Sequence, residues 1–363
     1  MTIRQLAALA GVSIGTVSRA LRNDTRISAP TRERVQQLAL AYNYQPNRLT
    51  QAILTNTSHL LGVLVPDMGY YFWARICKGI HAMAFQESYQ VITLETGIEL
   101  SRIRAGIDAL LSLRVDGILL MGSCNTQPVT NEALLGVWSR SIPLLTIDMI
   151  PVESEVDRVQ CNEEQMAQSA VDYLITLGHQ QIAYFGPTSI AQRRLAAVQR
   201  ALALRKLDTS LLIDVPFTTI KDHSADEATD ILTPLLQLRP IPTAVIAWED
   251  YYALLLMKQC AQRGIRIPHD LSILGYANTR YCLAASPSLT SIEQHPEQLG
   301  TEAFHLLLKR MREGIDPANH TPEIRRFEGQ LIRRGSCARP RVLQDLSHLT
   351  QATHCPVCSH DTA

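Results

Sequence analysis

From Leu60 onward the chain alternates between short apolar runs and amphipathic stretches. The apolar runs are rich in Val, Ile and Leu and are typical of buried strands: residues 60–65, 89–94, 115–121, 142–148, 181–186, 243–248 and 271–276. Helical periodicity occupies the stretches between them, near residues 73–87, 99–113, 130–140, 163–178, 190–206, 224–238 and 250–263. Buried strands that alternate with helices predict parallel α/β sheets with right-handed crossovers. Because about 270 residues exceed what one core comfortably holds, we expect two α/β lobes.

The first 60 residues follow a different pattern, that of short capped helices. Thr2 precedes an apolar stripe with helical spacing, and Gly11 is placed to end that helix in the left-handed conformation. Ser13 can cap a second helix, and Ser28 a third with Pro30 in its first turn. Two short helices joined by a tight glycine-containing turn predict a helix-turn-helix, although any helical hairpin resembles one.

The charges are unevenly placed along the chain. Over all 363 residues, 34 basic side chains balance 34 acidic ones. Residues 1–60 hold seven arginines, no lysine and two acids, a net charge of +5, so the remainder carries −5. A basic module joined to a mildly acidic body is typical of a nucleic-acid-binding protein; the alternative is a solvated arginine-rich face.

A helix-turn-helix presents the N-terminal residues of its second helix to base edges in the major groove. Here that helix offers hydroxyl groups that can contact phosphates, those of Ser13, Thr16 and Ser18. Arg19 can form a bidentate contact to guanine, and Ile14 can touch a thymine methyl group. Gly15 completes the segment that we expect to face DNA.

The N-terminal sequence resembles the DNA-binding domain of the LacI/GalR family of bacterial transcription regulators. The matching motifs are AGVS, TVSRAL, TRERV and Tyr44-x-Pro46-Asn47, and the α/β pattern downstream agrees over about residues 2–335. The resemblance implies a small all-α helix-turn-helix domain at 1–46 and a hinge helix and linker at 47–58. It further implies a two-lobed, periplasmic-binding-protein-like effector and dimerisation domain with parallel sheets at 59–335. The tail, 336–363, is expected to be disordered.

The resemblance also implies DNA contacts outside the second helix. Family members insert an apolar side chain from the hinge helix into the minor groove, and alignment on Pro46-Asn47 puts Ile53 at that position with Leu54 beside it. Further DNA contacts are implied for Thr2, Asn23, Tyr44 and Asn47. This chain lacks the arginine that often precedes the wedge and has a stiffer β-branched residue there, so a plain linker remains the alternative.

In the body, the resemblance implies an effector cleft between the lobes. The residues that fall at its positions are Tyr71, Phe72, Asp148, Arg194, Glu249 and Asp250. Glu249 stands where the family usually has asparagine, and Ala277 where it commonly has aspartate. Arg194 keeps the ability to hold an anionic group. These departures predict an effector unlike a typical sugar, or loss of the response to small molecules.

Taken together, the resemblance implies a homodimeric, ligand-responsive repressor that binds a pseudo-palindromic DNA operator and a small metabolite, such as a sugar or sugar derivative, in the bacterial cytoplasm. Alternatives are a regulator whose body answers to a protein partner, or a solute-binding or sugar-modifying α/β protein. We expect the protein to have no enzymatic activity and to bind no cofactor or metal, because no nucleotide-binding, hydrolase or zinc-protease motif occurs. A lone Cys355-x-x-Cys358 in the tail has metal-ligand spacing but no second pair. No secretory signal or membrane span is expected.

Overall fold

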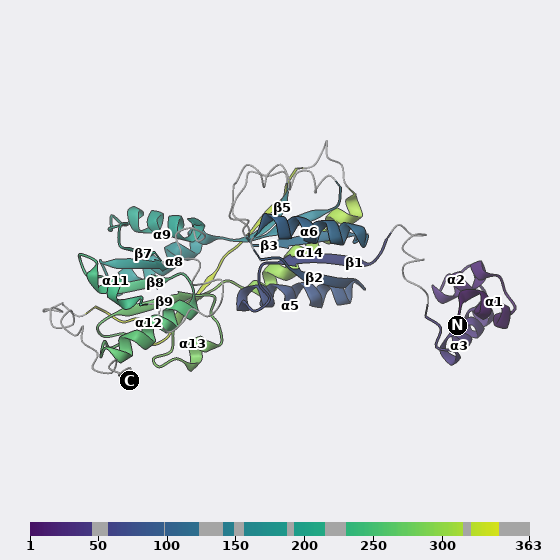
Figure 1. The fold of residues 1–363 in the computed structure, drawn as a ribbon, viewed down its shortest axis with the longest axis horizontal. Coiled ribbons are helices and arrows are strands. Elements are labelled where there is room, and N and C mark those ends of the chain that lie inside the picture. Colours follow the sequence, from purple (N-terminus) through teal and green to yellow (C-terminus); the bar gives the residue numbers. More distant parts are fainter. Residues whose placement is uncertain are drawn as a thin grey trace, which may run out of the picture. The chain divides into compact units, whose positions relative to one another are not determined.

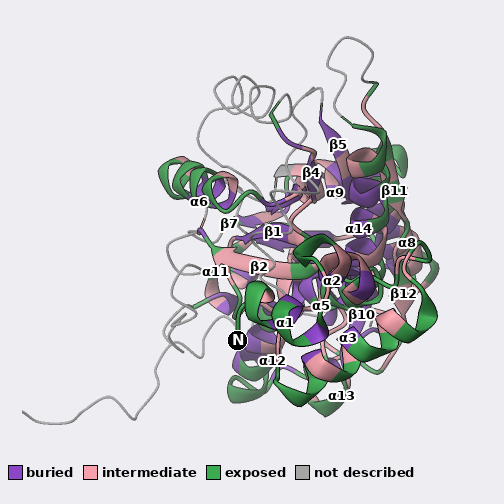
Figure 2. Ribbon diagram, turned by 90° about the vertical axis from the view of Figure 1, so that its right-hand side faces the viewer, coloured by how far each residue is buried: buried purple, intermediate pink, exposed green. Residues whose placement is uncertain are grey.

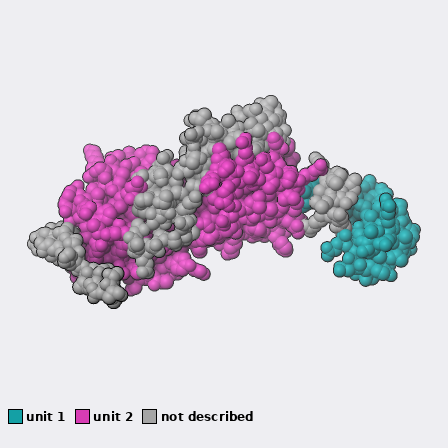
Figure 3. Space-filling model, viewed as in Figure 1, with its two compact units in different colours: residues 1–59 teal, residues 60–363 magenta. Residues whose placement is uncertain are grey.

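The computed structural model describes residues 1–45, 57–97, 99–122, 141–148, 156–186, 192–214, 230–314 and 321–340 (Figure 1). The chain divides into two compact units, Met1–His59 and Leu60–Ala363 (Figure 3). Asn47, Ile53 and Leu54, and with them the expected hinge helix, lie outside the described residues.

The first unit is a bundle of three helices, α1 (Ile3–Ala10), α2 (Ile14–Leu21) and α3 (Ala29–Ala41). Thr2 and Gln5 form a reciprocal capping box at the start of α1, and Gly11 ends that helix with φ 62°. The Ser13 hydroxyl accepts a hydrogen bond from the Thr16 N–H and so caps α2. The helices share a small apolar core of buried side chains: Leu6, Ala7, Ala10, Val17, Ala20, Val35 and Ala39. Caps and core together fix a helix-turn-helix.

The second unit contains two six-stranded sheets, each the centre of one lobe (Figure 1). Lobe 1 has the strand order β11-β5-β4-β3-β1-β2, with bounds β1 (Leu60–Val65), β2 (Gln90–Glu95), β3 (Gly117–Met121), β4 (Leu144–Ile147), β5 (Asp157–Cys161) and β11 (Ile324–Phe327). Lobe 2 has the order β12-β10-β9-β8-β6-β7, with bounds β6 (Ile182–Gly186), β7 (Leu212–Asp214), β8 (Ala244–Ala247), β9 (Ser272–Tyr276), β10 (Thr290–Glu293) and β12 (Gln330–Ile332). All described pairings are parallel except that of β10 with β12.

Helices cover the sheets. Lobe 1 carries α5 (Tyr71–Gln86), α6 (Leu100–Ser112) and α14 (Pro296–Glu313), and lobe 2 carries α8 (Glu163–Thr176), α9 (Gln192–Leu204), α11 (Leu232–Gln237), α12 (Asp250–Gln262) and α13 (Tyr281–Ala284). The inner strands, such as β1 and β4, are almost wholly buried, whereas the edge strand β2 is only partly buried (Figure 2). This contrast is the reason that the inner strands read as continuous apolar runs in the sequence.

The helices α5 and α14 pack closely at two glycines. A Cβ on Gly79 would clash with the backbone of Glu297, and a Cβ on Gly300 would clash with the backbone of Ile76. The two positions therefore need glycine for close approach of the two helices.

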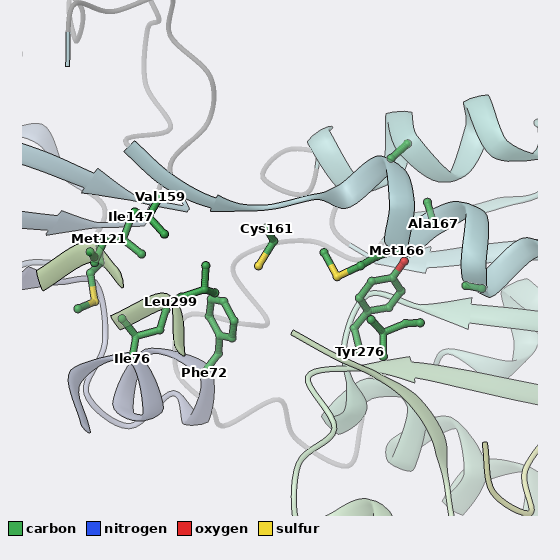
Figure 4. Packing of buried hydrophobic residues seen from close by; sticks show 14 of the residues in the cluster. Phe72, Ile76, Met121, Ile147, Val159, Cys161, Met166, Ala167, Tyr276 and Leu299 are labelled. Carbon is green, nitrogen blue, oxygen red and sulfur yellow. The ribbon is translucent and has the colours of Figure 1, made fainter. Parts of the chain in front are cut away.

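The chain crosses between the lobes after β5, after β10 and after β11, since each of these strands is followed by an element of the other lobe. Cys161, at the end of β5, lies between Phe72 in lobe 1 and Met166 and Tyr276 in lobe 2 (Figure 4). Only two residues separate β11 from β12, and Gln165 hydrogen-bonds to both the N–H and the carbonyl of the second, Gly329, at 2.9 and 3.2 Å. This contact fastens the third crossing to α8.

The two-lobed α/β fold with parallel sheets confirms the predicted fold class. Each of the seven expected buried strands is present within two residues of its expected bounds. Five short strands, β5, β7, β10, β11 and β12, and the helices α13 and α14 were not predicted. The expected helix at 130–140 lies outside the described residues.

The expected start of the tail at residue 336 was wrong. Ser336 and Cys337 are buried, and the Ser336 hydroxyl accepts from the Thr290 N–H at 2.9 Å. The Ala338 carbonyl lies 2.9 Å from Nε2 of the buried His179. The packed body thus continues to at least Ala338, because backbone groups of this segment complete the hydrogen bonding at the edge of lobe 2.

Candidate functional site

The first candidate site is the N-terminal end of α2. Ser13, Ile14 and Gly15 are exposed there, and Ile14 keeps 44% of its surface accessible. The opposite face of the same helix buries Val17 and Ala20 in the core of the bundle. One face of the helix is therefore packed in the bundle and the other faces solvent, which is the arrangement that a recognition helix needs to enter the major groove.

The polar side chains of this surface are positioned by contacts within α2. The hydroxyls of Ser13 and Thr16 lie 2.9 Å apart, and Arg19 Nε donates to the Gly15 carbonyl at 3.2 Å. Ser18 and Arg19 are partly exposed. The Arg19 guanidinium keeps N–H groups beyond that one bond, so it can still make a forked contact to a planar acceptor.

The electrostatics of the first unit suit an anionic partner. None of α1, α2 and α3 has an acidic residue in its first turn, so the positive ends of the helix dipoles are not neutralised there. Asp24 is ion-paired with Arg26 at 2.7 Å, and the side-chain hydrogen bond from Arg26 holds the pKa of Asp24 well below its usual range.

The other predicted DNA contacts have structural partners in the bundle. Thr2 caps α1 and is exposed. Asn23 has φ 58°, and its side-chain oxygen accepts from Gln36 at 2.7 Å, tying the end of α2 to α3. Tyr44 is partly buried against the core, and burial raises the pKa of its hydroxyl. These three side chains stabilise the module, and their contact with DNA stays a prediction.

The second candidate site surrounds Arg194, at the start of α9. Its Nε and Nη2 donate to the two carboxylate oxygens of Glu163 at 3.0 and 2.9 Å, and its Nη1 donates to the Trp248 carbonyl at 2.5 Å. The guanidinium lies 4.2 Å from the centre of the Tyr276 ring. Burial opposes the charge on the guanidinium, but the Glu163 carboxylate outweighs it and raises the pKa of Arg194. The arginine expected to hold an effector is thus already paired with an internal carboxylate.

Asp148, at the end of β4, is held in a similar way. Its carboxylate accepts from the Cys161 N–H at 3.2 Å and from Arg193 Nη1 at 3.4 Å. Burial raises the pKa of Asp148, while Arg193 acts in the opposite direction. Because Arg193 belongs to α9 and Asp148 directly follows β4, this ion pair joins the two lobes.

Glu249 and Asp250 differ in their surroundings. Asp250 is fully buried and accepts hydrogen bonds from the Thr279 N–H, the Ser291 hydroxyl and the Cys282 thiol, so it fastens the loop after β9. This placement argues against an effector contact by Asp250. Glu249 is 8% exposed, has no side-chain hydrogen bond at the start of α12, and burial raises its pKa well above the usual range.

The predicted aromatic pair is divided between surface and core. Tyr71 is partly exposed beneath the Arg75 guanidinium, which lies 5.6 Å from its ring centre. Phe72 is 5% exposed and packs beside Ile76 and Leu299 (Figure 4). Tyr71 therefore stays a candidate for ligand contact, and Phe72 is a core residue.

Sequence reasoning missed Glu163 and Arg193, the residues that satisfy Arg194 and Asp148. Glu163 lies 31 residues before Arg194 on a different helix, and an acidic residue in the first turn of a helix is ordinary. No local signal could have identified either pairing.

Within the described ranges, no group of three His, Cys, Asp or Glu side chains could hold a metal ion. Cys355 and Cys358 lie outside those ranges. Nor does any helix in the described part of the chain combine the length and apolarity that a membrane span needs.

Comparison with known proteins agrees with this architecture. The family model of bacterial regulatory proteins of the lacI family matches residues 2–47, and that of the periplasmic binding protein-like domain matches residues 171–337. The HTH-type transcriptional repressor PurR of Vibrio cholerae serotype O1 (strain M66-2) is 30% identical over 315 residues, which cover 86% of this chain and 92% of that protein. The repressor of the same name from Vibrio atlanticus is 31% identical over 319 residues, with the same coverage.

Solved structures show the same fold. The lac repressor dimer bound to operator and the anti-inducer ONPF matches with a TM-score of 0.79 at 24% identity, over 93% of this chain and 99% of that chain. The transcriptional regulator CelR in complex with cellobiose matches with a TM-score of 0.63 at 26% identity, with the same coverage. The chain therefore belongs to the LacI family of bacterial transcription regulators and is not an enzyme.

Proposed function

We propose that this protein is a repressor that binds a pseudo-palindromic DNA operator as a homodimer, each protomer reading one half-site with α2. The observation that carries this proposal is the exposed N-terminal end of α2, with Ile14, Gly15 and Arg19 on a helix whose first turn has no carboxylate. Relatives named as transcriptional repressors, and the likeness to a repressor dimer on its operator, support it. Action on chromosomal DNA would place the protein in the bacterial cytoplasm.

An exposed apolar patch on lobe 2 supports the homodimer. Tyr251 of α12 and Tyr281 and Leu283 of α13 keep 46%, 53% and 71% of their surface exposed. The two helices are in contact, and exposed large apolar side chains are typical of a surface that binds another protein. A two-fold contact of this kind would match the symmetry of a palindromic operator.

The proposed effector is a small metabolite, such as a sugar or sugar derivative, bound between the lobes. Support comes from CelR, which resembles this chain and was solved with cellobiose. Such a ligand would contact Tyr71, Asp148, Arg194 or Glu249, and would have to compete with the internal partners of Asp148 and Arg194. Binding would change the orientation of the lobes and so the population of DNA-binding states.

A second candidate function is a repressor whose body does not respond to small molecules or answers to a protein partner. The internal pairing of Arg194 with Glu163 favours it, because this pairing satisfies without a ligand the group expected to bind one. Thermal shift of the full chain with sugars, sugar phosphates and nucleobases separates the two candidates. A ligand that binds the folded protein raises the melting temperature, and the second candidate predicts no rise with any of them.

DNA binding is tested by fluorescence anisotropy on duplexes from the region upstream of the protein's own gene. We expect affinity well above that for a random duplex, with a steep fall as salt is raised. Equal affinity for both duplexes, or little dependence on salt, would overturn the proposal. Deleting residues 1–58 should abolish DNA binding and leave the fold of the second unit intact; a solute-binding or sugar-modifying protein would show no DNA binding at the outset.

A further inference from the structure

We propose that Arg158, Arg193 and Arg326 form a binding site for a small oxoanion, the phosphate or carboxylate group of a metabolite, at the edge of lobe 1 where β5 pairs with β11. This site is separate from Arg194, whose guanidinium is paired with Glu163.

The register of the two strands brings the site together. Arg326 of β11 lies opposite Gln160 of β5, and Arg158 lies two residues before Gln160. Side chains alternate between the faces of a strand, so Arg158, Gln160 and Arg326 share one face. Asp157 points to the other face, where it pairs with Arg310 of α14.

The third arginine comes from lobe 2. Arg193 reaches the end of β5, where its Nη2 donates to the Cys161 carbonyl at 3.0 Å and its Nη1 lies 3.4 Å from Asp148. Arg158 and Arg326 thus share one face of the β5–β11 pair, and Arg193 approaches the end of β5 from α9, where it contacts Cys161 and Asp148.

Within the described part of the chain, Arg193 is the one arginine of the three with a carboxylate partner, Asp148. Among the described residues, neither Arg158 nor Arg326 forms an ion pair, and Glu328, two residues after Arg326, does not pair with it either. Burial, together with the nearby Arg326 and Arg193, lowers the pKa of the Arg158 guanidinium. Arg158 is partly buried, whereas Arg326 is exposed. A partly buried charge without a counter-ion costs free energy, and an anion bound at Arg158 would offset that cost.

Two buried polar atoms of the cluster also have no hydrogen-bond partner, Arg158 Nε and Gln160 Oε1. Gln160 as a whole is only 7% exposed. Buried polar groups are nearly always satisfied, so these two atoms fit a ligand that offers an anionic oxygen and a hydroxyl or N–H donor. The burial of Gln160 fits a small molecule better than the backbone of a nucleic acid.

If the protein is a repressor as proposed, an anion bound at this site would affect DNA binding, and this effect alone depends on the proposed function. An anion held by all three arginines would tie α9 of lobe 2 to β5 and β11 of lobe 1, since Arg193 belongs to one lobe and Arg158 and Arg326 to the other. If lobe orientation sets operator affinity, such an anion would act as an effector.

The test uses the full chain in calorimetric titrations with glucose 6-phosphate, citrate and glucose at constant ionic strength. We compare the wild type with Arg158→Gln, Arg326→Gln and the control Arg312→Gln, an exposed arginine of α14 that pairs with Glu87. We expect at least one of the two anions to bind and glucose not to bind. Each of the two site variants should weaken that binding at least about tenfold, and the control should not. Binding of glucose 6-phosphate alone identifies a phosphate site, and binding of citrate alone a carboxylate site.

Melting temperatures without ligand guard against a purely structural role. Arg158→Gln removes an uncompensated charge and should melt at the wild-type temperature or above, whereas loss of a packing residue would lower it. Binding of neither anion to the wild type, unchanged affinity in both site variants, or a lower melting temperature for Arg158→Gln would overturn the site. Operator anisotropy on the same samples keeps the two proposals apart: DNA binding without anion binding rejects the site alone, and the converse rejects the proposed function alone.

Discussion

Replacing Glu163 by alanine should destabilise the second unit strongly. The carboxylate makes two hydrogen bonds to Arg194, at 3.0 and 2.9 Å, and the two side chains are only 9% and 11% exposed, so water screens the pair weakly. Removing one partner of a buried pair leaves the other charge uncompensated and costs about 3–5 kcal/mol. The Trp248 carbonyl and the Tyr276 ring remain beside the guanidinium, which favours the lower end of that range.

Urea unfolding of the full chain measures this free energy, with the helical first unit as an internal reference that the substitution does not touch. The double variant Glu163→Leu/Arg194→Met should lose less than the sum of the two single variants, since no buried charge is left alone. An exposed ion pair contributes less than about 1 kcal/mol to the free energy of unfolding, so a loss that small for Glu163→Ala would mean that the pair behaves as an exposed one. That result would refute the argument that Arg194 is occupied internally.

Three other substitutions test α2, the contact of α5 with α14, and the buried His179. Arg19→Ala should lose about 1–3 kcal/mol of discrimination at one base pair of each half-site, measured by anisotropy on operator variants, whereas a phosphate contact alone would weaken all sequences equally. Gly79→Ala should cost about 1–3 kcal/mol or more in urea, because its Cβ would clash with the backbone of Glu297; wild-type stability would show that α5 and α14 can move apart. Burial lowers the pKa of His179, so the neutral ring is favoured in the folded state and stability should fall as the pH drops below the ordinary value of 6.5. His179→Gln should reduce that fall, measured by urea unfolding at a series of pH values, and an unchanged slope would exclude His179 as its source.

The inner strands and the helix-turn-helix were predictable because their signals are local. A buried strand such as β3 is apolar at nearly every position, and Thr2, Gly11 and Ser13 mark helix ends by their own chemistry. The edge strand β11 could not be found this way, since its sequence Ile-Arg-Arg-Phe forms a strand only through its pairing with β5.

The candidate effector site was only partly predictable. The family resemblance identified Arg194 and Asp148, but not the carboxylate and the guanidinium that occupy them, since Glu163 and Arg193 reach these positions only through the packing of α8 and α9. Asp250 was also expected in the site; its carboxylate accepts hydrogen bonds from Thr279 and Ser291 within lobe 2, and its contact with an effector stays a prediction. Pairings between distant segments carry no periodic signal in a single sequence.

The three crossings between the lobes would restrict any change in lobe orientation. Because only two residues separate β11 from β12 and Gln165 holds Gly329, such a change would have to be a rotation about the crossings rather than a sliding motion. In such a rotation, the displacement of an atom grows in proportion to its distance from the axis. The ion pair between Arg193 and Asp148 is set beside the β5 crossing, so its breakage or release by a ligand would move the far ends of the lobes much more than the two side chains themselves.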